Sequence, residues 1–295
     1  MNRSRIQIAK TDIVSYFDEL PIQVLKLKEI RAILTQQRGF WRLAQNTTAE
    51  QFIGFLEKHS KLKSIEFPFP QRIEKCYVWG DTSLLTILLA LKKKLHLSHY
   101  TAMRMHGLTE QFPTSIYITE ERSTSYKREP VKVTQTEIDH AFQLPSRLSQ
   151  NWIEHLGKKI YLLNGADTNQ LGIVTERVND DDGREVQVSI SSIERTLIDI
   201  TVKPFYAGGI HEVAKAFELA KDRVSVNKLV ATLQKLKFTY PYHQAIGYYL
   251  ERANYKTSQL DLVRRLPMEV DFYLEHNMRE TRYINNWQLF VPNSF

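Results

Sequence analysis

The sequence predicts an α+β fold, in which a small helical part closed by a β-hairpin precedes a larger part that mixes helices with strands. Two observations predict it. Residues 12–59 carry apolar side chains at helical spacing and lead into two β-prone runs, whereas residues 82–275 alternate between helix and strand patterns. The chain has 295 residues, enough for about two domains of roughly 100–200 residues each. We place the domains at residues 1–80 and 81–295.

The N-terminal part contains helix signals followed by a hairpin signal. Helices are expected over residues 12–20, 25–37 and 47–59. Either Thr47 or Thr48 can cap the third helix, because Glu50 and Gln51 stand three residues after them. Two β-prone runs follow over residues 62–67 and 72–79, joined by a Pro-rich connection. This order of elements predicts a winged helix-turn-helix that ends at Gly80.

The second part predicts a mixed α/β domain with several helices and one small sheet. Helices are expected over residues 82–93, 98–106, 191–202, 209–221, 225–237, 242–253 and 258–265. Strands are expected over residues 115–119, 158–163, 172–178, 185–190 and 270–274.

Positive charge is concentrated near the N-terminus. Residues 1–79 hold 13 Lys and Arg against 8 Asp and Glu, whereas the whole chain holds 40 against 33. A basic domain beside a nearly neutral one suggests a polyanionic partner, and a merely solvated basic surface is the alternative.

The third predicted helix is the candidate for reading DNA, because the second helix of a helix-turn-helix lies in the major groove. Double-stranded DNA is therefore the expected partner. The candidate DNA-binding residues are Arg38, Arg42, Asn46, Thr47, Gln51, Lys58, Lys61, Lys63, Arg72 and Lys75. Glu50 and Glu57 on the same helix oppose a strong non-specific grip. A domain that binds protein, with solvated cations, is the alternative interpretation.

No pattern of catalytic or metal-binding residues is found, so the sequence predicts neither an enzyme nor a metal or cofactor site. His99 and His106 are two helical turns apart, too far to share one ion, and no His-Glu-x-x-His or Cys-x-x-Cys accompanies them. Asp180–Gly183 lacks the spacing of a calcium loop and predicts a turn between strands. Ala207-Gly208-Gly209 is interpreted as a tight loop that enters a helix rather than an anion site.

The expected setting is the cytoplasm. The single cysteine, Cys76, excludes an internal disulfide, and a reducing compartment is the default. The longest apolar run, residues 84–91, is too short to cross a bilayer, which needs about 20 apolar residues. No membrane partner is therefore expected.

Two stretches together resemble the AbiEi-type antitoxins of type IV toxin–antitoxin and phage-abortive systems. The first is residues 97–111, Leu-Ser-His-Tyr-Thr-Ala-Met-Arg-Met-His-Gly-Leu-Thr-Glu-Gln. The second joins Ser-Ile-Glu-Arg-Thr-Leu-Ile-Asp at 192–199 to Pro-Phe-Tyr-Ala-Gly-Gly at 204–209. Residues 225–229 and 240–247 add support, and the resemblance covers residues 82–275 best.

The resemblance implies an antitoxin whose N-terminal domain represses its own operon by binding inverted repeats in promoter DNA. It also implies a C-terminal domain that counteracts a nucleotidyltransferase-like toxin without forming a stable complex with it. An orphan regulator with no toxin, or an interaction module, is the alternative.

The motif residues of the antitoxin domain are His99, Tyr100, His106, Glu194, Arg195 and Asp199. Arg195 and Asp199 stand at i, i+4 spacing on one predicted helix, which permits an ion pair. We interpret this pair as an anchor of the helix to the sheet, and a direct role against the toxin is the alternative. His99, Tyr100 and His106 are likewise interpreted as residues that shape a domain core.

Overall fold

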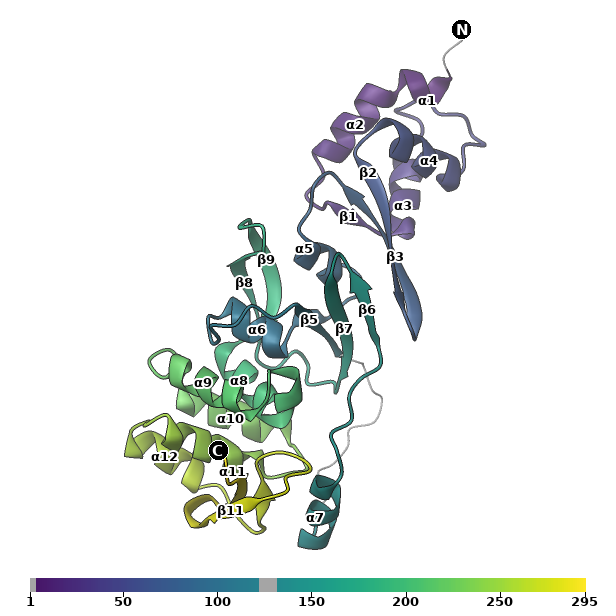
Figure 1. Cartoon of the computed structure of the whole chain (residues 1–295). Helices are drawn as coiled ribbons and strands as arrows, with labels where there is room; N and C mark the ends of the chain where they lie inside the picture. Colours follow the sequence, from purple (N-terminus) through teal and green to yellow (C-terminus); the bar gives the residue numbers. More distant parts are fainter. Residues whose placement is uncertain (1–3, 122–131) are drawn as a thin grey trace. The chain divides into compact units, whose positions relative to one another are not determined.

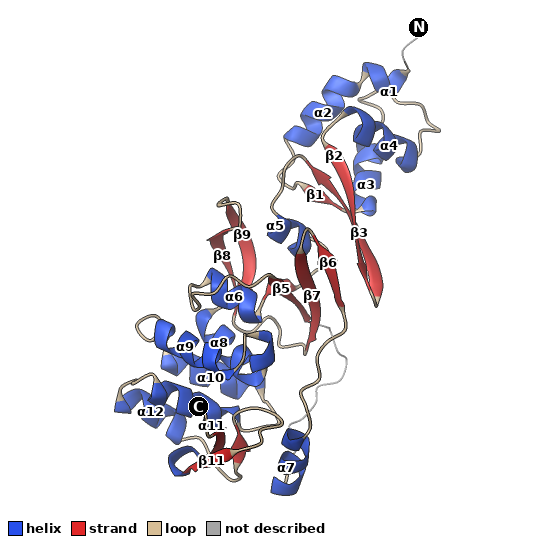
Figure 2. Cartoon of the chain, viewed as in Figure 1, coloured by secondary structure: helices blue, strands red, loops and turns tan. Residues whose placement is uncertain are grey.

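The computed structural model describes residues 4–121 and 132–295, and it shows a mixed α+β chain (Figures 1 and 2). The chain divides into two compact units. The first comprises the residues up to 93 together with 179–187, and the second comprises 94–178 and 188–295. The sequence places a boundary after residue 80, whereas this division falls after residue 93. The assignment of residues 179–187 to the first unit depends on contacts between residues that are far apart in the sequence, and the sequence alone does not reveal such contacts.

The N-terminal unit is built from short helices and a three-stranded antiparallel sheet. Its elements are α1 (Arg5–Ile8), α2 (Lys10–Asp18), β1 (Val24–Leu25), α3 (Leu27–Gln37), α4 (Ala49–His59), β2 (Leu62–Phe69), β3 (Arg72–Trp79) and α5 (Leu84–Leu89). The strand order is β1-β3-β2, and Leu62 pairs with Trp79 while Phe69 pairs with Arg72. The strands therefore run through Pro68 and Phe69, and the turn of the hairpin is shorter than the sequence suggests.

Aromatic side chains form the core of this unit. The rings of Phe17 and Trp79 lie 4.9 Å apart, and those of Trp41 and Phe52 are stacked at 5.7 Å. All four side chains are buried. Such pairs stabilise a fold by ~0.5–1.5 kcal/mol beyond the area they bury. They fix α2 and α4 against β3 and leave the outer side of α4 to solvent.

The second unit contains a six-stranded mixed sheet with the order β6-β7-β5-β4-β9-β8. Its strands are β4 (Leu95–Leu97), β5 (Ser115–Glu121), β6 (Trp152–His155), β7 (Lys158–Gly165), β8 (Ile173–Asn179) and β9 (Glu185–Ser191). β4 runs parallel to β9 and antiparallel to β5, and β5 runs parallel to β7.

Helices and a second small sheet complete this unit. The remaining elements are α6 (His99–Met105), α7 (Gln135–Gln143), α8 (Ile193–Val202), η1 (Pro204–Tyr206), α9 (Ile210–Ala220), α10 (Val226–Leu236), α11 (Tyr242–Arg252), α12 (Thr257–Arg264), β10 (Phe272–Tyr273), β11 (Thr281–Ile284), η2 (Asn285–Trp287) and β12 (Leu289–Pro292). The expectation of one small sheet for this part is wrong, because β10, β12 and β11 form a separate sheet. These strands have two to four residues, too few for a clear period-2 pattern.

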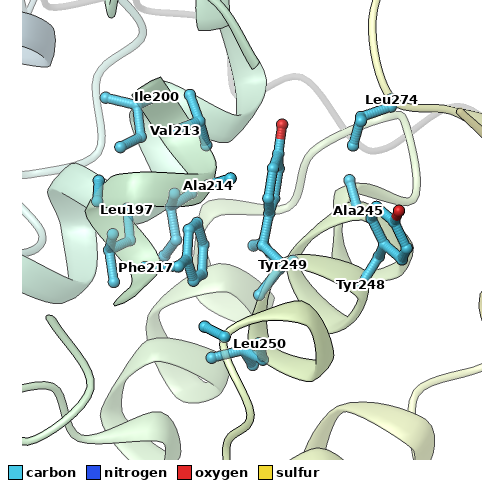
Figure 3. Packing of buried hydrophobic residues seen from close by; sticks show 14 of the residues in the cluster. Leu197, Ile200, Val213, Ala214, Phe217, Ala245, Tyr248, Tyr249, Leu250 and Leu274 are labelled. Carbon is cyan, nitrogen blue, oxygen red and sulfur yellow. The ribbon is translucent and has the colours of Figure 1, made fainter. Parts of the chain in front are cut away.

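The helices enclose one large hydrophobic core. Figure 3 shows Phe217 of α9 and Tyr249 of α11 side by side, and their rings are stacked at 5.1 Å. Gln244 of α11 is fully buried, and its amide nitrogen donates to the carbonyls of Val270, Trp287 and Gln288 at 2.9–3.1 Å. One side chain thereby joins α11 to the C-terminal sheet. In the described part of the chain, no helix is long and apolar enough to cross a membrane.

Candidate functional site

Helix α4 presents its outer side to solvent because one stripe of apolar residues holds the other side in the core. Ala49, Phe52, Ile53 and Leu56 are buried. Thr48 caps the helix: its hydroxyl accepts from the Gln51 backbone N–H at 3.2 Å, and its own N–H donates to the Gln51 side chain at 3.0 Å. The capping box expected from the sequence is therefore confirmed with Thr48. It occupies the amide oxygen of Gln51 and leaves the amide nitrogen as a donor.

Arg38, a candidate DNA-binding residue, makes its hydrogen bonds within the N-terminal unit. Its guanidinium donates to the carbonyl oxygens of Ala44, Gln45 and Thr47 at 2.6, 3.2 and 3.0 Å. These bonds hold the connection between α3 and α4 in shape. Since this guanidinium is occupied by backbone acceptors, Arg38 positions the neighbouring residues rather than offering a free cation.

Three of the other candidate cations have carboxylate partners. Lys61 donates to Asp18 at 2.8 Å, Lys75 donates to Glu66 at 2.8 Å, and Arg72 lies 3.6 Å from Glu74. Asp18 also accepts from the Trp79 indole at 2.7 Å. The hydrogen bonds from Lys61 and Trp79 lower the pKa of Asp18.

The remaining candidates face solvent. Arg42, Asn46, Lys58 and Lys63 are exposed, and Thr47 is partly buried. Arg42 has a left-handed backbone with φ of 50° in the turn between α3 and α4. The negative charge on α4, which would oppose DNA binding, is partly neutralised because Glu50 pairs with Arg31 at 3.2 Å. The exposed positive charge beside α4 therefore comes from Arg42, Lys58 and Lys63.

Gly54 lies between Gln51 and Lys58 on the exposed side of α4. A Cβ added there would meet no atom within 4 Å, so packing within the protein does not require glycine. Glycine in a helix costs about 0.5–1 kcal/mol relative to alanine, and one use of it is close approach of the backbone to a ligand.

A second basic group lies at β3, and the sequence does not predict that its members come together. Lys26, Arg72 and Lys92 surround the buried carboxylate of Glu74 at 3.9, 3.6 and 3.7 Å. Three cations around one carboxylate leave an excess of positive charge beside the hairpin. Burial lowers the pKa of Lys26. Sequence alone gives no signal for this group, because its members are far apart along the chain.

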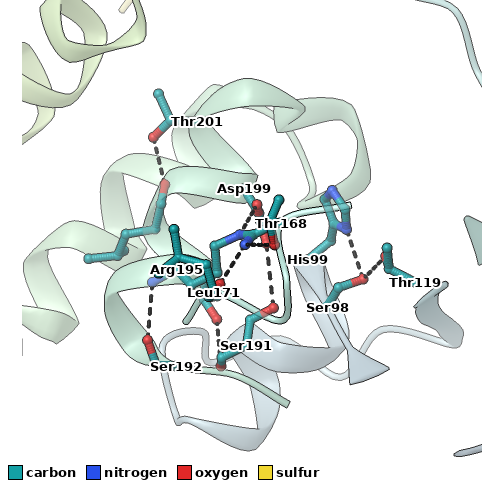
Figure 4. A network of polar contacts seen from close by, with 12 residues as sticks. Ser98, His99, Thr119, Thr168, Leu171, Ser191, Ser192, Arg195, Asp199 and Thr201 are labelled. Carbon is teal, nitrogen blue, oxygen red and sulfur yellow. Dashed lines mark hydrogen bonds and ion pairs between the residues drawn. The ribbon is translucent and has the colours of Figure 1, made fainter. Parts of the chain in front are cut away.

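Figure 4 shows three motif residues of the second unit, Arg195 and Asp199 on α8 with His99 beside them. Arg195 and Asp199 form the expected i, i+4 ion pair at 2.8 Å, with side chains only 10% and 11% exposed. Arg195 also donates to the Leu171 carbonyl at 2.6 Å, and Ser191 donates to Asp199 at 3.4 Å.

His106 and Glu194 connect the start of α8 to other elements of the unit. The imidazole Nε2 of His106 contacts the Ser191 carbonyl at 2.6 Å. Glu194 pairs with Lys228 of α10 at 3.0 Å and accepts from the Ser225 backbone N–H at 3.3 Å. The carboxylate thus ties the first turn of α8 to the first turn of α10.

His99 and Tyr100 begin α6. His99 is buried with φ of 48°, its Nδ1 contacts the Ser98 hydroxyl at 3.0 Å, and burial lowers its pKa to about 3. Tyr100 donates to Glu212 of α9 at 3.3 Å. A Cβ on Gly208 would lie 2.8 Å from the Glu212 side chain. The Glu212 carboxylate is in the first turn of α9, close to the place where an anion would bind.

The motif residues of the second unit connect elements of its fold. Its motif residues form hydrogen bonds and ion pairs with one another and with backbone groups. Among the described residues, no group of three His, Cys, Asp or Glu side chains could hold a metal ion. Cys76 is buried on β3, and burial raises its pKa.

No protein-family model matches this chain, and a comparison with curated proteins finds no significant match. The fold is similar to the crystal structure of the RV2827C protein from Mycobacterium tuberculosis. The TM-score is 0.58 over 98% of this chain and 92% of that chain, at 15% sequence identity. This likeness establishes a shared mixed α+β fold.

Proposed function

We propose that this chain is a DNA-binding repressor whose N-terminal unit binds duplex DNA as a winged helix-turn-helix. In this proposal α3 and α4 form the helix-turn-helix, α4 enters the major groove and the β2–β3 hairpin is the wing. The observation that carries it is the exposed side of α4, where Gln51, Gly54 and Lys58 lie outward. Lys63 at the start of the hairpin adds a further exposed cation for phosphate.

We extend the proposal to an antitoxin that represses its own operon. This part rests on the resemblance to the AbiEi-type antitoxins. Its support is that residues 97–111 and 192–209, which carry the resemblance, contact each other through the rings of His99 and Tyr206, whose centroids lie 5.4 Å apart. The proposed C-terminal activity is to counteract a nucleotidyltransferase-like toxin without a stable complex.

A salt titration of promoter binding tests the DNA-binding part. Lys58→Ala with Lys63→Ala should weaken binding of the full chain to its own promoter. It should also lower the slope of log K against log salt by up to about 2, because each phosphate contact contributes roughly 0.9. Lys235→Ala with Arg265→Ala, two exposed cations of the second unit, is the matched control. If the first variant binds like the parent at every salt concentration, the proposed interface is wrong.

Co-expression with the product of an adjoining nucleotidyltransferase-like gene tests the antitoxin part. The Lys58→Ala, Lys63→Ala chain should still protect cells although it no longer represses. If the parent chain gives no protection, the antitoxin part fails while the repressor part stands. If only the variant fails to protect and it is folded, protection depends on DNA binding.

A further inference from the structure

Three aromatic side chains form one row across neighbouring strands of the six-stranded sheet. Tyr117 of β5 is paired with Tyr161 of β7, and Tyr161 is paired with Trp152 of β6. Paired residues point to the same face of a sheet, so the three rings share one face. The rings of Tyr117 and Tyr161 are stacked at 4.9 Å, and those of Tyr161 and Trp152 lie 6.1 Å apart.

The row is covered at one end and open at the other. Tyr117 is buried beside Tyr206, with ring centroids 5.4 Å apart. Tyr161 and Trp152 are only partly buried, and Trp152 lies on the edge strand β6. The other three tryptophans of the chain are all buried. The outer half of the row therefore presents aromatic faces that the core does not enclose.

Positive charge accompanies the open end. Lys159 is exposed, and its ammonium lies 4.9 Å from the centre of the Trp152 ring. At the covered end, the Lys203 ammonium lies 5.8 Å from the ring of Tyr206. Glu154, which is paired with Lys159, is an exposed acid on the same face. A cation thus lies against a ring at each end of the row, and the exposed Lys159 can leave Trp152 without disturbing the core.

We propose that Trp152, Tyr161 and Lys159 form a stacking platform for single-stranded nucleic acid. A nucleobase would stack on the outer face of the Trp152 ring, which Tyr161 backs from the next strand, and the Lys159 ammonium would move from Trp152 to a backbone phosphate. Every base has a π-face, so such a platform tolerates sequence, and it requires unpaired bases because a duplex hides those faces. This activity is separate from the proposed duplex binding, since it lies in the second unit.

Fluorescence tests the platform on the full chain. Lys58→Ala with Lys63→Ala serves as the background, so that the N-terminal unit contributes little. We expect labelled 12-nucleotide oligo(dT) or oligo(U) to bind and to quench the emission of Trp152. Trp152→Leu should weaken binding by roughly 10-fold, whereas Trp152→Phe, which keeps an aromatic face, should retain most of it.

A second variant keeps the proposal testable if Trp152→Leu does not fold. Lys159→Gln leaves the rings in place and should lower the salt slope of binding by about 1. The proposal is overturned if the parent binds neither oligonucleotide at low salt, or if folded Trp152→Leu binds as tightly as Trp152→Phe. It is also overturned if a blunt duplex of equal length displaces the labelled strand as well as unlabelled oligo(dT) does.

Discussion

Gly54 lies on the exposed side of α4, where nothing in the protein requires the absence of a side chain. Gly54→Ala should stabilise the fold by about 0.5–1 kcal/mol, since alanine favours a helix more than glycine does. The same methyl group should weaken promoter binding, because it would hold the helix away from DNA. Thermal unfolding and a binding titration measure the two effects. A variant that is more stable and binds equally well would show that DNA does not approach α4 at this residue.

Gly247 is the opposite case, because its surroundings leave no room. A Cβ there would lie 2.1–2.4 Å from ring atoms of Trp287, which is fully buried and donates to Glu251 at 2.8 Å. Gly247→Ala should destabilise the chain by about 1–3 kcal/mol or more through overpacking. Gly39→Ala is the matched control, since a Cβ at Gly39 meets no atom within 4 Å. Equal denaturation midpoints for the two variants would show that Trp287 can move aside.

At the scale of elements, the stability of α8 depends on the ion pair between Arg195 and Asp199. Asp199→Ala would leave Arg195 buried without its carboxylate, and such a loss typically costs about 3–5 kcal/mol. Asp261→Ala is the matched control, because its pair with Arg264 at 3.2 Å is exposed and such pairs contribute about 1 kcal/mol or less. Urea unfolding compares the two.

Protection from the proposed toxin gives the functional measurement for Asp199→Ala. If α8 is a scaffold, protection should be lost only in proportion to the unfolded fraction. A variant that melts like the parent and does not protect would contradict this and assign Asp199 to a functional surface.

The sequence predicts the longer elements well, because their signals are local. The helix expected over 47–59 is α4 with its Thr48 cap, and the runs expected over 62–67 and 72–79 are β2 and β3. β4 and β6 were missed because three or four residues carry no recognisable period. α7 was missed as well, although Thr134 and Glu137 form a capping box at its start.

The candidate site was harder to predict than the elements, because side-chain partners come from distant parts of the chain. Charge alone marks Lys61 as a candidate for DNA, and only the fold shows that Asp18 holds it. The acceptors of Arg38 are backbone carbonyls, which have no sequence signature. The contact of His106 with Ser191 likewise joins residues 85 positions apart. Composition reveals the excess of charge in a unit but not which cations are free.

At the scale of the whole molecule, stability should fall as the pH drops from 7 to 5. Burial lowers the pKa of His99 to about 3 and that of His243 to about 4, and it also lowers the pKa of His96. These rings are neutral in the fold, but the unfolded chain protonates them below pH about 6.5. The unfolded state then binds more protons, so stability decreases with falling pH. Glu275 acts in the opposite sense, because burial raises its pKa.

His99→Asn isolates one of these contributions. Asparagine tolerates the left-handed backbone that His99 adopts, and it does not titrate. In the parent chain, the free energy of unfolding should lose about 2 kcal/mol from His99 between pH 7 and pH 5, which follows from a folded pKa of about 3. Urea unfolding at the two pH values should therefore show a smaller difference for His99→Asn than for the parent. His140→Asn, on an exposed position of α7, is the matched control and should keep the parental difference. If His99→Asn keeps it too, the His99 ring is not held neutral by the fold, and the acid sensitivity comes from other groups.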